Sequence, residues 1–237
     1  MTPLERTLVF WVPDWPIHAH LRDQEAEEQP QERVSPAQAA DPPPTNDRAI
    51  APIALIAQHR VVACSPAARA EGVRTGLRER EAQSRCPNLV VHAHQPEVDE
   101  RRFAPVVAAL EQLIPEIELR RPGLCAMRVR GPARYYGGEE PAAAALLQLA
   151  TELGFPLARV GIADGLFAAE QVVRAATTSP GVEAPADGIR ICAPGGSAAF
   201  LSQLPVSRAA SAGFADLLVG LGIRTPAALA ALPGEAV

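Results

Sequence analysis

The chain has 237 residues, 48% of them hydrophobic, which is enough for one large domain or two to three small ones. Its formal net charge of −5 argues against strong, free-standing binding to nucleic acid, because phosphate contacts dominate such binding. The chain has arginine but no lysine, which excludes a lysine nucleophile, a Schiff base and a P-loop lysine.

The N-terminal part is predicted to form strands and short helices around a polar insertion. Residues 7–12 are β-branched and aromatic, as in a buried strand. Residues 23–52 are rich in Gln, Glu, Pro and Ala and are predicted to form a mobile insertion. Residues 54–57 and 60–64 predict a hairpin that turns at Gln58-His59.

The rest of the chain alternates between strands and helices. Ser65 suits an N-cap and Pro66 a first turn, which predicts a helix at 67–71. The later predictions, in chain order, are a helix at 77–85, a strand at 89–92, a helix at 101–113, strands at 117–119 and 126–129, a helix at 140–153, a strand at 160–163, a helix at 166–176, a linker at 179–186, and helices at 197–203, 213–221 and 226–232.

The cysteines indicate a reducing compartment. No two cysteines form a C-x-x-C pair, so we expect buried thiols and neither disulfides nor a zinc site. No signal peptide or membrane span is visible, and we expect a cytoplasmic protein.

The segment VVACSPAARAEGVRTGL, residues 61–77, resembles the fingers motif of Y-family (translesion) DNA polymerases, a strand followed by Y-x-A-R-x-x-G-V-x-x-G-M. In that family the tyrosine and arginine hold the triphosphate of the incoming nucleotide. The resemblance implies this role for Arg69, although Pro66 stands at the tyrosine position. Alternatively, Arg69 pairs with Glu71 or another neighbour. Arg74 and the arginines after it either face DNA or form a mixed, solvated surface with nearby acids.

Two further segments resemble the metal-binding core of the same family. Residues 8–16 resemble the opening D-x-D-x-F strand, and residues 121–128 resemble S-x-D-E-A-x-L-D. The counterparts of the catalytic acids are Val12, Asp14, Gly123 and Leu124. Because two divalent metals need several carboxylate ligands, these changes predict that the chain binds no metal and is not an enzyme.

Other acids and histidines are possible substitute ligands. Asp14 is a remnant ligand or, as we favour, part of a turn or cap. Glu139-Glu140 precede a helix, where acids suit the N-terminal dipole. His18-x-His20 and His92-x-His94 have metal-ligand spacing but no third ligand nearby in sequence, so we interpret them as surface or core residues.

The C-terminal part continues the resemblance. Residues 160–170 resemble V-G-I-A-x-N-K-x-x-A-K without its lysines, and residues 200–206 and 220–225 resemble the thumb. The second thumb segment is similar to a helix-hairpin-helix turn that binds a DNA phosphate, or it is a packed α-hairpin. The predicted contacts in this turn are Gly220, Gly222, Arg224 and Thr225. Residues 203–206 resemble a clamp-binding peptide, but we favour packing within the thumb.

The resemblance implies a mixed α/β (α+β) right hand. Its expected parts are a discontinuous, ferredoxin-like palm at 1–16 and 88–178, small fingers at 17–87 that carry the insertion 23–52, and a partial helical thumb at 179–237. The little finger and C-terminal region are expected to be absent from this chain.

The pattern of lost acids is similar to that of the ImuB family, catalytically inactive Y-family-like proteins of bacterial mutagenesis cassettes. That resemblance implies a scaffold for damage-induced (SOS), error-prone translesion synthesis, with no cofactor. The implied partners are an error-prone C-family DNA polymerase, an ImuA-type accessory protein, the sliding clamp and, weakly, primer–template DNA. The alternatives are an active, divergent Y-family polymerase and a pure protein-interaction module.

Overall fold

The computed structural model describes residues 5–28, 51–176 and 179–232. The chain divides into two compact units. Unit 1 comprises Met1–Trp11, Ala126–Leu147 and Arg159–Val237, and unit 2 comprises Val12–Cys125 and Gln148–Ala158. Among the described residues, no helix has the length and apolar character needed to cross a membrane.

Helices and strands are interleaved along the chain, which confirms the predicted mixed α/β class. In chain order the elements are β1 (Arg6–Trp11), α1 (Trp15–Glu28), β2 (Ile53–Ala57), β3 (Arg60–Cys64), α2 (Pro66–Ala70), α3 (Glu79–Arg85), β4 (Val90–Ala93), α4 (Pro96–Leu113), β5 (Glu118–Arg121), β6 (Leu124–Arg128), α5 (Arg130–Tyr136), α6 (Glu139–Glu152), β7 (Arg159–Asp164), α7 (Leu166–Val172), β8 (Val182–Glu183), β9 (Ile189–Cys192), α8 (Ser197–Ser202), the 3-10 helix η1 (Val206–Arg208), α9 (Ala212–Gly220) and α10 (Pro226–Ala230).

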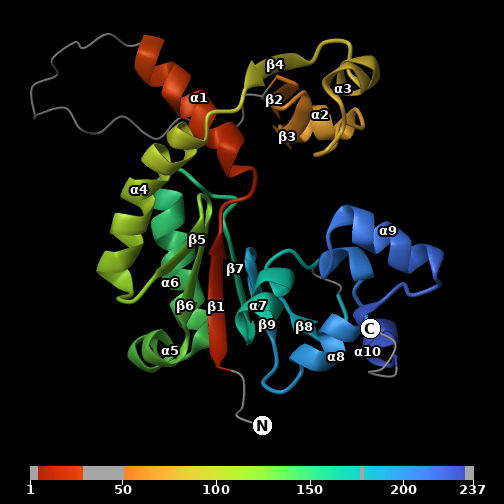
Figure 1. The fold of residues 1–237 in the computed structure, drawn as a ribbon. Helices are drawn as coiled ribbons and strands as arrows, with labels where there is room; N and C mark the ends of the chain where they lie inside the picture. The colour runs from red at the N-terminus through yellow and green to blue at the C-terminus, as the bar shows by residue number, and fades with distance from the viewer. Residues whose placement is uncertain (1–4, 29–50, 177–178, 233–237) are drawn as a thin grey trace, which may run out of the picture. The chain divides into compact units, whose positions relative to one another are not determined.

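The larger sheet has the strand order β5-β6-β1-β7-β9-β8. In unit 1, β1 runs antiparallel to β7, with Leu8 opposite Ile162, and β7 runs parallel to β9. Helix α7 packs on these strands (Figure 1). A Cβ atom on Gly161 would lie 2.5 Å from the backbone nitrogen of Val173, so glycine is what lets the chain at the end of α7 approach β7 this closely.

An ion-pair network connects β1, α6 and β7 in unit 1. Arg6 donates two hydrogen bonds to the carboxylate of Glu139, at 2.6 and 2.7 Å, and one to Asp164 at 3.2 Å. Asp164 also accepts a hydrogen bond from the backbone nitrogen of Gly195 at 2.6 Å. Glu139, predicted only to suit the helix dipole, therefore also fixes the start of α6 to the sheet.

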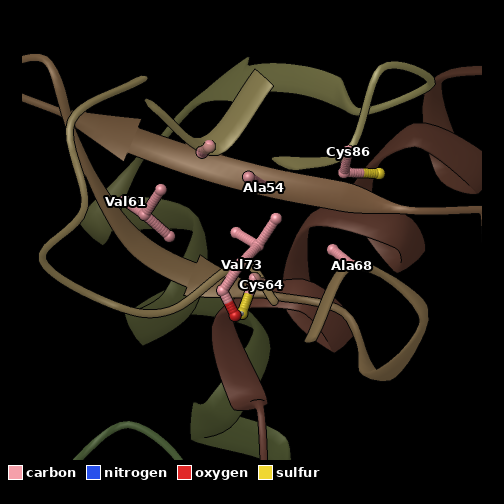
Figure 2. Packing of buried hydrophobic residues seen from close by; sticks show 7 residues of the cluster. Ala54, Val61, Cys64, Ala68, Val73 and Cys86 are labelled. Atoms are coloured by element: carbon pink, nitrogen blue, oxygen red, sulfur yellow. Dashed lines mark hydrogen bonds between the residues drawn. The ribbon is translucent and has the colours of Figure 1, made fainter. Parts of the chain in front are cut away.

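Unit 2 contains a second sheet, with the order β3-β2-β4, beside α2 and α3 (Figure 1). The β2–β3 hairpin turns at Gln58 and His59, which have positive φ angles of 49° and 59°, the conformation that matches the twist of paired strands. Its core is the cluster in Figure 2, built from Ala54, Val61, Cys64, Ala68, Val73, Ala82 and Cys86.

Helices α1 and α4 pack together around aromatic side chains in unit 2. Trp15 is 1% exposed, and its ring centroid lies 4.7 Å from that of Phe103 and 5.3 Å from that of Phe155. The indole nitrogen of Trp15 donates to the carbonyl oxygen of Asp99 at 3.0 Å. The indole is thus both buried and hydrogen-bonded, as a well-placed core tryptophan requires.

Several predicted boundaries were wrong. Residues 23–28, assigned to the mobile insertion, continue α1, because Gln, Glu and Ala are good helix formers as well as common loop residues. Residues 29–50 of that insertion lie outside the described residues. The predictions also missed α1, η1, α5, β8 and β9. The last three are short and begin beside Gly residues that look like turns in the sequence.

Candidate nucleic-acid interface

Three of the four counterparts of the catalytic acids are buried and apolar. In unit 2, Val12 follows β1 directly and is 2% exposed, while Leu124 begins β6 and is fully buried. The backbone nitrogen of Val12 donates to the carbonyl oxygen of Gly123 at 2.8 Å. The structure therefore brings the two predicted segments together, as the resemblance implies.

Gly123 is held in a position that excludes any side chain. Its φ angle is +82°, and a Cβ atom there would lie 2.4 Å from Cβ of Trp15 and 3.2 Å from the carbonyl oxygen of Val12. An aspartate at this position would need Trp15 and the backbone to move. The glycine is thus required by local packing as well as by backbone conformation.

Asp14 has both a backbone role and a side-chain role. Its φ angle is 53°, and its carbonyl oxygen accepts from the backbone nitrogens of Ile17 and His18 at 2.9 and 3.3 Å, at the start of α1. Its carboxylate lies 2.5 Å from Nη2 of Arg69. The favoured role in a turn or cap agrees with the backbone geometry, while the side chain forms an ion pair.

Arg69, on α2, donates from the same nitrogen to the carbonyl oxygen of Cys64 at 3.1 Å. Partial burial lowers the pKa of its guanidinium, but the hydrogen bond and attraction from Asp14 outweigh this, and the net pKa is raised. The side chain is still 43% exposed. Arg69 therefore stays charged and accessible, and its partner is Asp14, not Glu71.

Arg74 lies next to Arg69 and supports the backbone at the end of α2. Its Nη1 donates to the carbonyl oxygen of Val73 at 2.8 Å and to that of Arg69 at 2.5 Å. The rest of the side chain is exposed. Arg74 thus holds the segment that carries Arg69.

The four predicted histidines lie in three separate contacts in unit 2, of which one joins His18 to Phe155, with ring centroids 5.9 Å apart. The rings of His20 and His92 lie 4.4 Å apart, and His94 lies 2.8 Å from the carboxylate of Asp99. In the described part of the chain, no three His, Cys, Asp or Glu side chains are grouped so that they could hold a metal ion.

In unit 1, the predicted hairpin turn joins α9 to α10. Gly220 is the last residue of α9, and Gly222 has a φ of +84°, which only glycine adopts without strain. The backbone nitrogens of Gly222 and Ile223 donate to carbonyl oxygens of α9 at 3.0 and 2.9 Å. These two amide groups already close the helix end, as in a Schellman-type cap.

The other two predicted turn residues have different surroundings. The carbonyl oxygen of Arg224 accepts from the backbone nitrogen of Val206 at 2.8 Å, and the Arg224 side chain is exposed. The hydroxyl of Thr225 accepts from the backbone nitrogen of Ala228 at 3.2 Å and caps α10. Val206 is buried with Ala215 and Leu218, so the end of the clamp-like peptide packs against the hairpin.

The Asp14–Arg69 ion pair was not predicted from the sequence. The two residues are 55 positions apart, and neither has a charged partner at a helical spacing that would have indicated the contact. The only indication in the sequence was indirect: Asp14 and Arg69 both lie in segments that resemble motifs of one polymerase family.

Comparison with known proteins supports the predicted superfamily. The sequence profile of the impB/mucB/samB family matches residues 43–173. No curated protein matches the chain. Among solved structures, the chain is similar to those of Y-family DNA polymerases.

One such structure is a ternary complex of Dbh with partially disordered substrates, which is 14% identical, with 98% of this chain and 61% of that chain covered and a TM-score of 0.64. An insertion ternary complex of Dbh DNA polymerase has 14% identity, coverages of 93% and 58%, and a TM-score of 0.63. DinB from Sulfolobus solfataricus has 13% identity, coverages of 93% and 58%, and a TM-score of 0.57. The chain thus spans about 60% of the length of these polymerases.

These findings correct the expectation that the chain is not an enzyme. The fold is that of DNA polymerases, and neither the family match nor the fold match indicates a loss of catalysis. The loss of acids at Val12, Gly123 and Leu124 does not by itself decide activity.

The two divalent cations that this fold implies do not fit those four positions as they stand. Val12, Gly123 and Leu124 supply no carboxylate, and the carboxylate of Asp14 is paired with Arg69. Hard divalent cations prefer charged oxygen ligands, and one paired carboxylate is a poor donor set.

Proposed function

Because the chain belongs to the impB/mucB/samB family, we propose that it binds primer–template DNA and acts in translesion DNA synthesis. The observation that carries the proposal is the extent of the fold similarity, which covers 98% of this chain in the comparison with a ternary complex of Dbh. In that assignment the fingers, 17–87, contain β2, β3, α2 and α3, and the thumb, 179–237, contains α9 and α10.

Arg69 is the residue that we assign to phosphate binding in the fingers. It is charged and 43% exposed, and its Nη2 donates both of its hydrogen bonds, to Asp14 and to the carbonyl oxygen of Cys64. A phosphate group would compete with the Asp14 carboxylate for the same guanidinium, since both are oxygen anions that arginine binds well. Arg74 supports this position by fixing the backbone of Arg69.

In the thumb, the proposed DNA contacts are Gly220, Gly222, Arg224 and Thr225. The backbone N–H of Gly222 already donates to a carbonyl oxygen of α9 and is not available to a phosphate. The exposed guanidinium of Arg224 is therefore the main phosphate-binding group that we assign to this turn. A phosphate contact of this kind positions DNA without reading its sequence.

A bridging role of the ImuB type is the second proposal. The observation that favours it is the donor set of Val12, Asp14, Gly123 and Leu124, which differs from that of the metal-binding core it resembles. In this role the protein would connect DNA, the sliding clamp, an ImuA-type protein and an error-prone C-family polymerase during damage-induced synthesis. The role does not depend on whether the chain itself extends a primer.

The test is binding of a fluorescent primer–template at low and moderate salt, with magnesium and nucleotides present so that extension is measured in the same samples. We expect salt-sensitive binding that weakens in Arg69→Ala, because phosphate contacts release counterions. Asp14→Asn should strengthen binding, because it frees Arg69 and because asparagine tolerates the positive φ of this position.

The matched control is Arg85→Ala. Arg85 lies in the same unit, is 44% exposed and pairs with Glu81, so its removal changes the charge equally. Equal losses in the Arg69 and Arg85 variants would refute the assignment of Arg69, and no binding at any salt would refute the proposed function. Extension would assign synthesis to the chain itself, whereas binding without extension would favour the bridging role.

A further inference from the structure

A second basic site lies on unit 2, at the end of the β2–β3 hairpin. A cavity of about 540 Å³ opens between the hairpin turn and the first part of α3. Its walls are Gln58, His59, Arg60, Arg78, Glu79, Arg80 and Gln83. This volume is within the range of small-ligand sites, about 300–1,000 Å³.

The charge of the cavity is opposite to that of the chain. Three arginines and one glutamate give its walls a formal charge of +2 with neutral histidine, whereas the whole chain carries −5. A positive cavity on an acidic protein attracts an anion that the rest of the surface repels. Arginine forks are especially suited to the oxygens of phosphate.

The backbone under the cavity is firmly held. The backbone nitrogen of Glu79 donates to the carbonyl oxygen of His59 at 3.0 Å, and that of Val61 donates to the carbonyl oxygen of Leu77 at 2.9 Å. Arg60 and Arg78 form a backbone β-bridge. Val61 belongs to the core in Figure 2, so the backbone that carries the cavity residues is anchored to packed side chains. Little conformational entropy of the backbone is therefore lost when a ligand binds.

The guanidinium groups differ in how they are used. Arg60 donates to the carbonyl oxygen of Gly76 at 2.8 Å, and Arg85, outside the cavity, pairs with Glu81. The side chains of Arg78 and Arg80 make no hydrogen bond or ion pair with another residue in the described ranges, and both are exposed. Their donors are therefore available to a ligand, whereas Arg60 mainly supports the wall.

We propose that this cavity binds phosphate of a nucleic-acid strand, at a site separate from Arg69. The walls contain no Phe, Tyr or Trp ring on which a base could stack, so the contact is to the backbone and independent of base sequence. The site gives the fingers a second contact with the nucleic-acid backbone. Phosphate binding follows from the cavity itself, and only the identification of the phosphate as that of a nucleic acid rests on the proposed function.

The direct test is titration of the protein with inorganic tripolyphosphate, with the side-chain Nε–H signals of the arginines followed by NMR. We expect the signals of Arg78 and Arg80 to shift and that of Arg85 to stay. No shift of Arg78 and Arg80 would overturn the proposal. A shift would support the site even if the protein failed to bind primer–template DNA, so the two ideas fail separately.

The second test measures binding of a fluorescent single-stranded oligonucleotide as a function of salt. We compare Arg78→Ala/Arg80→Ala with the control Arg130→Ala/Arg134→Ala, whose arginines are exposed on α5; each double variant removes two arginines and lowers the formal charge from −5 to −7. The first variant should bind about tenfold more weakly, and its salt slope should fall by about 0.7 for each phosphate that the protein no longer neutralises. If free nucleotide displaces the oligonucleotide at concentrations similar to those of unlabelled oligonucleotide, the site binds nucleotides and the proposal of a strand site is wrong. If free nucleotide does not displace it, the site binds the DNA backbone, as proposed.

Equal losses in the two double variants would mean a general charge effect and would overturn the proposal. Arg78→Lys/Arg80→Lys separates charge from geometry, because lysine keeps the charge but loses the fork. We expect it to restore the salt slope and only part of the affinity. Since all four substituted arginines are exposed, each variant should keep the thermal midpoint of the parent, which serves as the check on folding.

Discussion

Gly123→Ala is expected to destabilise unit 2 strongly. The φ angle of +82° costs an L-residue about 1–2 kcal/mol. The new Cβ, 2.4 Å from Cβ of Trp15, adds an overpacking cost of about 1–3 kcal/mol. Together the loss is about 2–5 kcal/mol, a large part of the roughly 5–15 kcal/mol that stabilises a typical domain.

The clash can be separated from the backbone strain by a matched variant. Gly76 lies in the same unit with a φ of +90°, and a Cβ there would meet nothing within 4 Å. Gly76→Ala should therefore cost only the backbone part, about 1–2 kcal/mol. Any excess cost of Gly123→Ala then measures the clash with Trp15.

The assay is urea unfolding followed by tryptophan fluorescence. The chain has two tryptophans, so a Trp11→Phe background leaves Trp15 as the reporter beside Gly123. Gly123→Asp should destabilise further, because it adds a buried carboxylate to the same clash. Equal costs for Gly123→Ala and Gly76→Ala would refute the argument that Trp15 excludes a side chain at position 123.

Two further predictions concern ionisable groups in unit 2. Hydrogen bonds from Arg101 and Arg102 lower the pKa of Asp23, so its stabilising contribution is present above the unfolded value of about 3.9 and is lost as pH falls through the folded value. Urea midpoints should therefore differ between the parent and Asp23→Asn at about pH 7 and converge at about pH 2, and a gap that is constant with pH would contradict this. All four cysteines are buried and free, and burial raises the pKa of the Cys125 thiol to about 12. A thiol reagent at about pH 8 should label Cys125 only after denaturation, and rapid labelling of the native protein, located by mass spectrometry, would show that this burial is wrong.

Local chemistry made much of the fold predictable. The strand at β1, the hairpin turn at Gln58-His59 and the Ser65 cap of α2 depend on residues adjacent in sequence. Helix α1 was not predicted, because its Gln/Glu/Ala-rich second half suits both a helix and a loop, and its conformation depends on what the first turns pack against.

The candidate site was predictable only in outline. The family motifs assigned Val12 and Gly123 to one metal-binding core, and the two residues are joined by a backbone hydrogen bond. They gave no reason for the glycine, which follows from the indole that packs above it. They also led to the wrong conclusion about enzyme class, because the absence of acids from a motif does not by itself decide activity.

Composition and neighbouring residues were enough to establish most of the strands and helices, the polymerase-like superfamily, the absence of lysine chemistry and the negative net charge. The folded structure was needed to show that Asp14 pairs with Arg69, that Trp15 closes the space at Gly123, and that Arg78 and Arg80 share a cavity with His59. Each of these contacts joins residues far apart in the chain, and their distances depend on how the elements pack.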